Sequence, residues 1–242
     1  MNAFGGAHVD EGAIKFEAEH ASAVLDERRY GELACKLVAW REILGLTRLV
    51  GQEPELYGGF GYGNVSARVG PPGAALGRRS FLITGTQTSG KTCMTLADFC
   101  LVERYDIAHN RVFSRGAVDP SSESMTHGAV YDLGPHIRFV FHGHCPVIWR
   151  RAKALRLPTT DPNVAYGTPE MAREVARLYR STALPETRIL AMGGHEDGVI
   201  AFGRDAEEAG QITLRTLAQA YEAACDEAGC GLCRDAVPGR SG

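Results

Sequence analysis

The spacing of apolar residues along the chain switches between a helical and an extended period. Leu33, Leu37, Trp40 and Leu44 recur at helical spacing, which predicts an amphipathic helix from about Glu27 to Val50. Glycines crowd the next stretch, YGGFGYGNVSARV, and predict a turn that leads into a strand. Further strands are predicted for SFLIT (80–84), FCLV (99–102), RVFS (111–114) and IRFVFHGH (137–144), and a strand pair for RILAMGGHEDGVIAFG (188–203).

Capping signals predict three more helices. They run from Ser122 to about Tyr131, from Thr168 to about Thr182 and from Asp205 to about Glu227. Residues 1–24 show no clear period and are predicted to form an N-terminal arm, and residues 229–242 a C-terminal tail. There is no internal repeat and no interdomain linker between them, so residues 25–228 are predicted to form one mixed α/β domain.

Composition excludes several classes of protein. The 242 residues carry a net charge of −3, and no basic stretch is denser than residues 150–153, so we expect no nucleic-acid surface. No apolar run approaches the roughly 18 to 20 residues of a membrane span, and the first twenty residues lack the pattern of a secretory signal. Seven cysteines, an odd number spread along the chain, fit a reducing cytoplasm.

The predicted strand IRFVFHGH contains two histidines one residue apart. Because side chains alternate along a strand, His142 and His144 point to the same face and Gly143 to the other. Their Cα atoms would lie roughly 6.6 Å apart, close enough for two ring nitrogens to converge on one metal ion. The pattern also fits two core histidines hydrogen-bonded to backbone, so it leaves both interpretations open.

The loop GTQTSGKT (85–92) matches the phosphate-binding pattern of nucleotide-binding P-loops. In such an enzyme Lys91 would reach the terminal phosphates and Thr92 would bind Mg²⁺. A P-loop needs a helix that starts at the lysine, whereas here a cap at Thr95 and a strand-like run follow. We therefore favour a Gly/Thr-rich turn that binds a phosphate or oxyanion through backbone amides, and keep the nucleotide binder as the alternative.

The stretch PSSESMTH (120–127) gathers polar groups at a helix start. Glu123, His127 and Tyr131 fall at i, i+4 and i+8, on one face of the predicted helix. The two serines before Glu123 lie where free amides and the helix dipole favour an anion. This arrangement is also simply a good helix start.

These motifs together resemble the class II aldolase/adducin family, which includes fuculose- and rhamnulose-phosphate aldolases and ribulose-phosphate 4-epimerases. The matching segments, in the family's order, are GNVSAR (63–68), FLITGTQTSG (81–90), PSSESMTH (120–127) and FVFHGHCP (139–146), followed by YGTPEMAREV (166–175) and HEDGVIAFG (195–203). The resemblance spans about Glu27 to Glu227. It implies a central, mainly antiparallel sheet flanked by helices, and a homotetramer with active sites between subunits.

The resemblance also implies a function. A small-molecule substrate, a phosphorylated sugar or hydroxy-ketone, would be cleaved in the retro-aldol direction through a metal-stabilised enediolate, by a metal-dependent lyase of carbohydrate metabolism. One divalent ion per subunit, zinc before manganese, iron or cobalt, would be held by His142, His144 and a third histidine. Glu123 matches the catalytic acid/base. The positions that match the substrate-phosphate site are Gly63, Asn64, Thr86, Ser89, Gly90, Ser121 and Ser122.

The chain departs from the family pattern at the third metal ligand. The family histidine stands directly before a glycine, but here Asp197 precedes Gly198 and His195 lies two residues earlier. In an extended segment both share a face; we favour His195 and keep Asp197 as the alternative. The stretch from His144 to His195 is also short for a sugar-phosphate aldolase. A decarboxylase, dehydratase or oxygenase acting on a keto or hydroxy acid, and a non-catalytic adducin-like module, therefore stay open.

A cysteine cluster lies near the C-terminus. Cys225, Cys230 and Cys233 contain one C-x-x-C pair, which is typical of zinc or redox sites, but no second pair follows. We favour a solvated tail.

Overall fold

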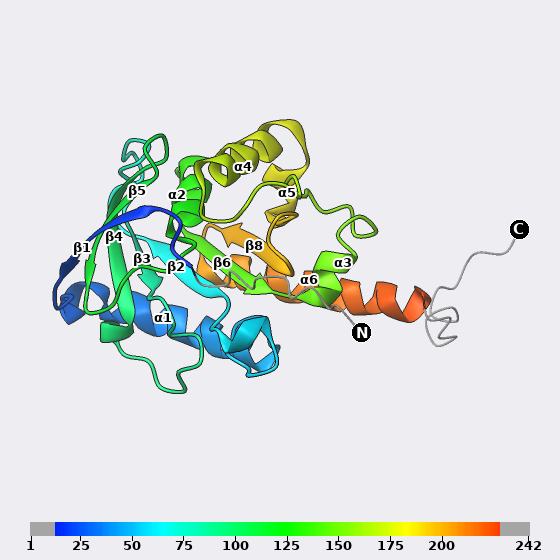
Figure 1. The fold of residues 1–242 in the computed structure, drawn as a ribbon, viewed down its shortest axis with the longest axis horizontal. Helices are drawn as coiled ribbons and strands as arrows, with labels where there is room; N and C mark the ends of the chain where they lie inside the picture. The colour runs from blue at the N-terminus through cyan, green and yellow to red at the C-terminus, as the bar shows by residue number, and fades with distance from the viewer. Residues whose placement is uncertain (1–12, 228–242) are drawn as a thin grey trace, which may run out of the picture.

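The computed structural model describes residues 13–227, and its centre is a sheet of eight strands (Figure 1). The strands are β1 (Glu17–Ser22), β2 (Asn64–Arg68), β3 (Phe81–Thr84), β4 (Phe99–Asp106), β5 (Arg111–Gly116), β6 (Phe139–His144), β7 (Ile189–Ala191) and β8 (Gly198–Gly203). They lie in the order β1-β5-β4-β3-β2-β6-β8-β7. Only the β1–β5 pair is parallel among the described strands, so the sheet is mainly antiparallel, as predicted.

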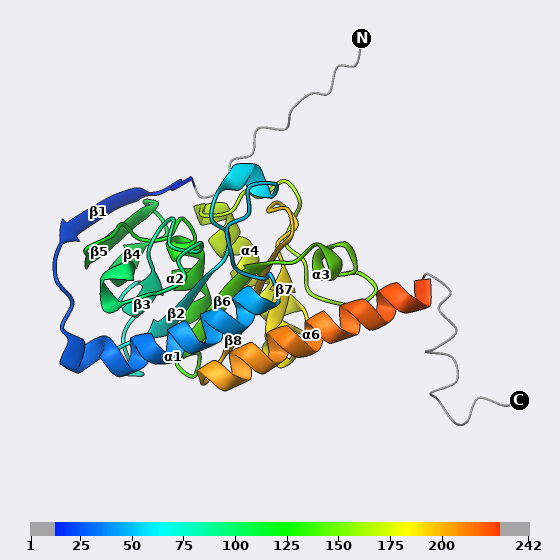
Figure 2. The same cartoon turned by 90° about the horizontal axis from the view of Figure 1, so that it is seen from below.

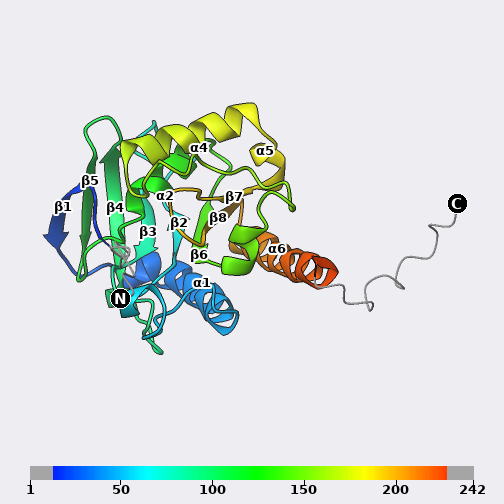
Figure 3. The ribbon, with the colours of Figure 1, turned by 45° about the vertical axis from the view of Figure 1, so that its right-hand side comes forward.

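Helices cover both faces of this sheet. They are α1 (Glu27–Leu46), α2 (Ser124–Asp132), α3 (Pro146–Arg150), α4 (Pro169–Ser181), α5 (Leu184–Thr187) and α6 (Ala206–Glu227), with 3₁₀ turns at Tyr57–Gly59 and Leu96–Asp98. The long helices α1 and α6 run side by side along one face (Figure 2). Helices α2 and α4 pack together over the other face (Figure 3). The described chain is thus a three-layer α/β structure.

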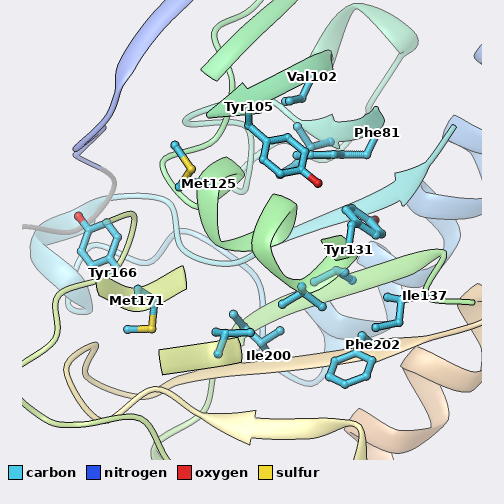
Figure 4. Packing of buried hydrophobic residues seen from close by; sticks show 14 of the residues in the cluster. Phe81, Val102, Tyr105, Met125, Tyr131, Ile137, Tyr166, Met171, Ile200 and Phe202 are labelled. Atoms are coloured by element: carbon cyan, nitrogen blue, oxygen red, sulfur yellow. The ribbon is translucent and has the colours of Figure 1, made fainter. Parts of the chain in front are cut away.

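Each layer boundary holds its own apolar core. Between the sheet and helices α2 and α4, the buried side chains include Phe81, Tyr105, Met125, Tyr131, Met171 and Phe202 (Figure 4). Between the sheet and helices α1 and α6, they include Leu37, Leu44, Val65, Leu82, Phe141 and Ala220. Burial of both sheet faces explains why the central strands read as apolar runs rather than as alternating ones.

Strand β6 shows how the sheet orients the two histidines. It lies between β2 and β8, opposite Asn64 on one side and Ile200 on the other at the level of His142. Val140 belongs to the core under α2, and Phe141 to the core under α1. The pleat therefore directs His142 and His144 toward the α2 face.

Helix ends follow the predicted caps in part. Thr168 accepts a hydrogen bond from the Met171 amide at 3.2 Å, and Asp205 accepts one from the Glu208 amide at 2.7 Å. Helix α1 ends at Leu46 rather than near Val50, because Arg48 adopts a left-handed conformation with φ of 58°.

The start of α2 also differs from the prediction. Ser122 does not cap this helix: Glu123 occupies the N-cap position, and the helix begins at Ser124. The Ser121 hydroxyl instead accepts from the Glu123 amide at 3.4 Å. The Glu123 side chain makes no capping hydrogen bond, so its carboxylate is left for contacts outside the helix.

The N-terminal arm differs from its prediction where it is described. Residues 17–22 form β1, which pairs with β5 at the sheet edge. Its side chains are mostly exposed, so it shows no apolar period. Residues 1–12 and the predicted tail 229–242, with Cys230 and Cys233, lie outside the described residues. Among the described helices, none is both long enough and apolar enough to cross a membrane.

Candidate metal centre

Three histidines meet on the α2 face of the sheet. His142, His144 and His195 each offer a ligand atom, and these atoms all lie within 4.8 Å of one another. Their ring centroids are 4.6 to 5.2 Å apart. All three side chains are at most 5% exposed.

Backbone contacts orient the first of these rings. His142 Nδ1 lies 3.1 Å from the carbonyl oxygen of Val199 on the neighbouring strand. A carbonyl only accepts, so Nδ1 carries a proton, and in the neutral ring Nε2 keeps its lone pair. A backbone carbonyl that fixes the tautomer in this way is one of the common partners of a metal-binding histidine.

His195 comes from the tight turn between β7 and β8. Its amide bonds to Met192 O at 3.2 Å, and its carbonyl accepts from the Gly198 amide at 2.9 Å. Two glycines let segment 160–164 approach this turn closely. A Cβ at Gly193 would lie 2.2 Å from the carbonyl oxygen of Thr160, and a Cβ at Gly194 would lie 2.1 Å from that of Val164. The turn is not the extended segment that would place His195 and Asp197 on one face.

The two candidates for the third ligand, His195 and Asp197, lie in different surroundings. His195 belongs to the histidine cluster, and Asp197 is not part of that cluster. The Asp197 carboxylate instead accepts a hydrogen bond from the Tyr57 hydroxyl at 2.9 Å.

Glu123 reaches the cluster from the start of α2. Its Oε1 lies 3.2 Å from His195 Nδ1, and the side chain is 1% exposed. Burial alone would raise the pKa of this carboxyl group. Contact with His195 and the positive charge that His142 and His195 can carry outweigh burial and lower the pKa to about 2. Glu123 is therefore an ionised carboxylate beside three imidazoles.

One serine of β2 holds the remaining polar side chains of α2 against the sheet. Ser66 Oγ on β2 lies 2.7 Å from His127 Nδ1 and 2.7 Å from the Tyr131 hydroxyl. All three residues are fully buried. Burial lowers the pKa of His127 to about 3, so this ring is neutral. The predicted Glu123, His127 and Tyr131 face thus divides: Glu123 faces the histidines, and the other two anchor α2 to the sheet.

Most of the predicted substrate-phosphate residues line one small cavity next to Glu123. Gly63, Asn64, Thr86, Ser89, Ser121 and Ser122 line it, together with Gly61, Gly85, Gln87 and Glu123. We call this cavity the anion cradle. Gly63 has φ of 74°, and a Cβ there would lie 2.8 Å from Val50, so only glycine fits this turn.

Gly90 does not line the anion cradle, in contrast to its prediction. A Cβ at this position would lie 2.4 Å from Gln52 Oε1, so the glycine faces the 51–60 segment instead. Arg41 holds the loop that contains Gly90: its buried guanidinium donates hydrogen bonds to the backbone carbonyls of Thr88 and Ser89.

The same loop lacks the geometry of a nucleotide P-loop. The residues after Lys91 form turns and a 3₁₀ segment that leads into β4, and no helix begins at the lysine. The Lys91 ammonium pairs with Asp98. The resemblance to a P-loop is therefore limited to sequence.

The donor set fits a divalent metal ion. Three buried imidazoles and an adjacent carboxylate match the ligands that Zn²⁺ prefers, and imidazole also suits Fe²⁺, Mn²⁺ and Co²⁺ sites that include an oxygen ligand. Two further aromatic rings enclose the cluster, and sequence reasoning did not assign them. Tyr57 packs edge-on against His144 at 4.7 Å, and Tyr166 stacks on His195 at 4.3 Å.

Solved structures similar to this chain share its fold. L-fuculose-1-phosphate aldolase from Thermus thermophilus aligns with a TM-score of 0.59 at 21% identity, covering 86% of this chain and 99% of that chain. A sugar-phosphate aldolase from Thermotoga maritima aligns with a TM-score of 0.53 at 17% identity, covering 83% and 98%. An aldolase II superfamily protein from Pseudomonas syringae aligns with a TM-score of 0.55 at 16% identity, covering 89% and 83%.

Comparison at the sequence level identifies the family. Curated proteins yield no match. The family described as Class II Aldolase and Adducin N-terminal domain matches residues 42–225, well over half of the chain and the whole of the region that holds the three histidines, Glu123 and the anion cradle. The chain therefore belongs to the class II aldolase/adducin family.

Proposed function

We propose that this protein is a metal-dependent lyase that cleaves a carbon–carbon bond of a small phosphorylated sugar or hydroxy-ketone in the retro-aldol direction. One observation carries the proposal: the ionised Glu123 carboxylate lies 3.2 Å from one of three buried histidines whose ligand atoms converge, and it also lines the anion cradle. A proton-transfer group thus lies between a metal site and an anion site.

Metal binding and proton transfer would be carried out by different residues of the site. A divalent cation held by His142, His144 and His195 would supply Lewis-acid chemistry at the substrate oxygens. Glu123, ionised and buried, takes a proton from the substrate hydroxyl group whose oxygen becomes the new carbonyl, and returns it to the other fragment.

The anion cradle suits a dianion held by neutral donors. Its described lining offers hydroxyl groups, the amide side chains of Asn64 and Gln87 and backbone amides, with the Glu123 carboxylate at one side, and it contains no cationic side chain. Such a set binds phosphate and also binds a carboxylate. The cavity encloses about 20 Å³, room for about one water molecule, so phosphate binding requires the lining side chains to move outward.

Family resemblance supports the remaining parts of the proposal. These are zinc as the ion, a homotetramer with active sites between subunits, a role in carbohydrate metabolism and a cytoplasmic location. Two alternatives make different predictions. A family relative acting on a keto or hydroxy acid would need the same metal but no phosphate, and an adducin-like binding module would need neither.

A thermal-shift panel with Zn²⁺ or Mn²⁺ present separates these alternatives. The panel compares sugar phosphates with their unphosphorylated analogues and with small keto and hydroxy acids, and any stabilising ligand is then assayed for carbonyl products. Saturation at a hundred times the dissociation constant stabilises the protein by about 2.7 kcal/mol. Phosphate esters that stabilise the protein and are cleaved support the proposal. Stabilisation by carboxylic acids alone would overturn the sugar-phosphate assignment.

A further inference from the structure

Two residues far apart in sequence meet at the edge of the histidine cluster. The Tyr57 hydroxyl donates a hydrogen bond to Asp197 Oδ2 at 2.9 Å. Tyr57 lies in a 3₁₀ turn between α1 and β2, and Asp197 in the turn that carries His195. The bond thus joins two loops from different parts of the sheet.

Both partners hold an unusual backbone conformation. Tyr57 has φ of 49° and Asp197 has φ of 61°, in the left-handed region that favours glycine. Such a conformation is unfavourable at a residue with a side chain, and it persists where surrounding contacts impose it. The two residues that bond to each other beside the cluster are thus both held in conformations that their surroundings impose.

Each partner also contacts the elements that carry the histidines. The Tyr57 ring packs edge-on against His144 at 4.7 Å. The Asp197 carbonyl accepts a hydrogen bond at 2.7 Å from the amide of Cys145, the residue directly after His144. Asp197 is 5% exposed, so its contacts act in a setting with little water. Through these contacts the pair links the end of β6 to the turn of His195.

We propose that Tyr57 and Asp197 form a clasp that positions His144 and His195 to bind the metal ion, and that both are positioning residues rather than ligands. The inference rests on the metal centre of the proposed function, but not on the reaction. The competing arrangement is direct ligation by Asp197, whose Oδ1 is buried without a hydrogen-bond partner in the part of the chain that the structure describes.

Titration of metal-free protein with Co²⁺, followed by visible absorption, tests the clasp. Tyr57→Phe keeps the ring and removes the hydroxyl, and Asp197→Asn keeps the shape and removes the charge. Loss of such a supporting contact weakens metal affinity by about 10- to 100-fold. We expect both variants to lose affinity in this range with altered absorption bands. The double variant should be little weaker than either single one, because both changes act on the same bond: Tyr57→Phe removes its donor, and Asp197→Asn replaces its charged acceptor with a weaker neutral one.

Tyr62→Phe is the matched control. Tyr62 packs against the same Tyr57 and His144 rings, but its hydroxyl bonds to Glu53. This variant should bind Co²⁺ like the wild type. Wild-type affinity and spectrum in Tyr57→Phe would overturn the clasp, and loss of binding in Asp197→Asn alone would identify Asp197 as a ligand. Failure of the wild type to bind Co²⁺ would instead contradict the metal centre itself.

Discussion

Replacement of Ser66 by alanine should destabilise the protein far more than an ordinary serine substitution. The Ser66 hydroxyl lies within hydrogen-bond reach of His127 Nδ1, the Tyr131 hydroxyl and the Val140 carbonyl, at 2.7, 2.7 and 3.5 Å. One assignment satisfies all three contacts: Ser66 accepts from the histidine and the tyrosine and donates to the carbonyl. The alanine variant leaves two buried donors without an acceptor.

The magnitude follows from that count. A buried donor that loses its partner costs about 1–3 kcal/mol, so two cost about 2–6 kcal/mol. A domain of ordinary stability has about 5–15 kcal/mol in total. The double variant Ser66→Ala/Tyr131→Phe removes one of the two stranded donors, so we expect it to be more stable than Ser66→Ala by about 1–3 kcal/mol.

Urea unfolding at a fixed protein concentration measures both differences. Ser80→Ala is the control, since that hydroxyl is half-buried and makes one long bond of 3.4 Å to Val69, and it should change the free energy of unfolding by less than about 0.5 kcal/mol. A loss below about 1 kcal/mol in Ser66→Ala, or a double variant less stable than the single one, would refute this account of the network.

Three further predictions concern catalysis, acid stability and the turn of His195. Glu123→Gln should lower turnover by about 10²- to 10⁴-fold and leave the amount of bound metal unchanged. The same change at the exposed Glu196 is the control and should leave turnover unaltered. Equal turnover in the wild type and both variants would assign the proton transfer to another group. Burial raises the pKa of Glu208, but hydrogen bonds from Arg204 and nearby positive charge outweigh it and lower that pKa below 4.5. The contribution of ionised Glu208 to the free energy of unfolding is therefore present above pH 4.5 and lost as the pH falls below it. The difference in urea midpoint between the wild type and Glu208→Gln should shrink on acidification. A difference that grows on acidification would contradict the lowered pKa. Gly194→Ala places a Cβ 2.1 Å from a backbone oxygen and should weaken metal binding by displacing His195. Metal titration measures this loss of affinity. Unchanged affinity would show that the turn tolerates a side chain.

The features that sequence predicted well depend on local rules. The period of two in IRFVFHGH predicts that His142 and His144 share a face. In the structure both lie in the regular strand β6, and they do share that face. The position of Glu123 at a helix start follows from the motif around it, although Ser122 does not act as the cap. Such features need no knowledge of which strands pair.

The features that sequence could not supply depend on tertiary contacts. His195 reaches the cluster because a turn bends its segment, whereas an extended segment would place His195 and Asp197 on one face, so the sequence kept Asp197 as an alternative ligand. Tyr57 comes from a glycine-rich segment whose path carries no periodic signal. Strand β1 has exposed side chains and is defined only by its pairing with β5, so no alternation of apolar residues marks it.

The metal content of the purified protein tests the central claim most directly. Elemental analysis of the wild type should find close to one divalent ion per chain. His142→Ala should lose that ion, and His109→Ala, which changes an exposed histidine paired with Asp106, should keep it. A wild-type protein that carries no metal and takes up none when Zn²⁺, Mn²⁺ or Fe²⁺ is added would contradict the assignment of a metal-dependent lyase.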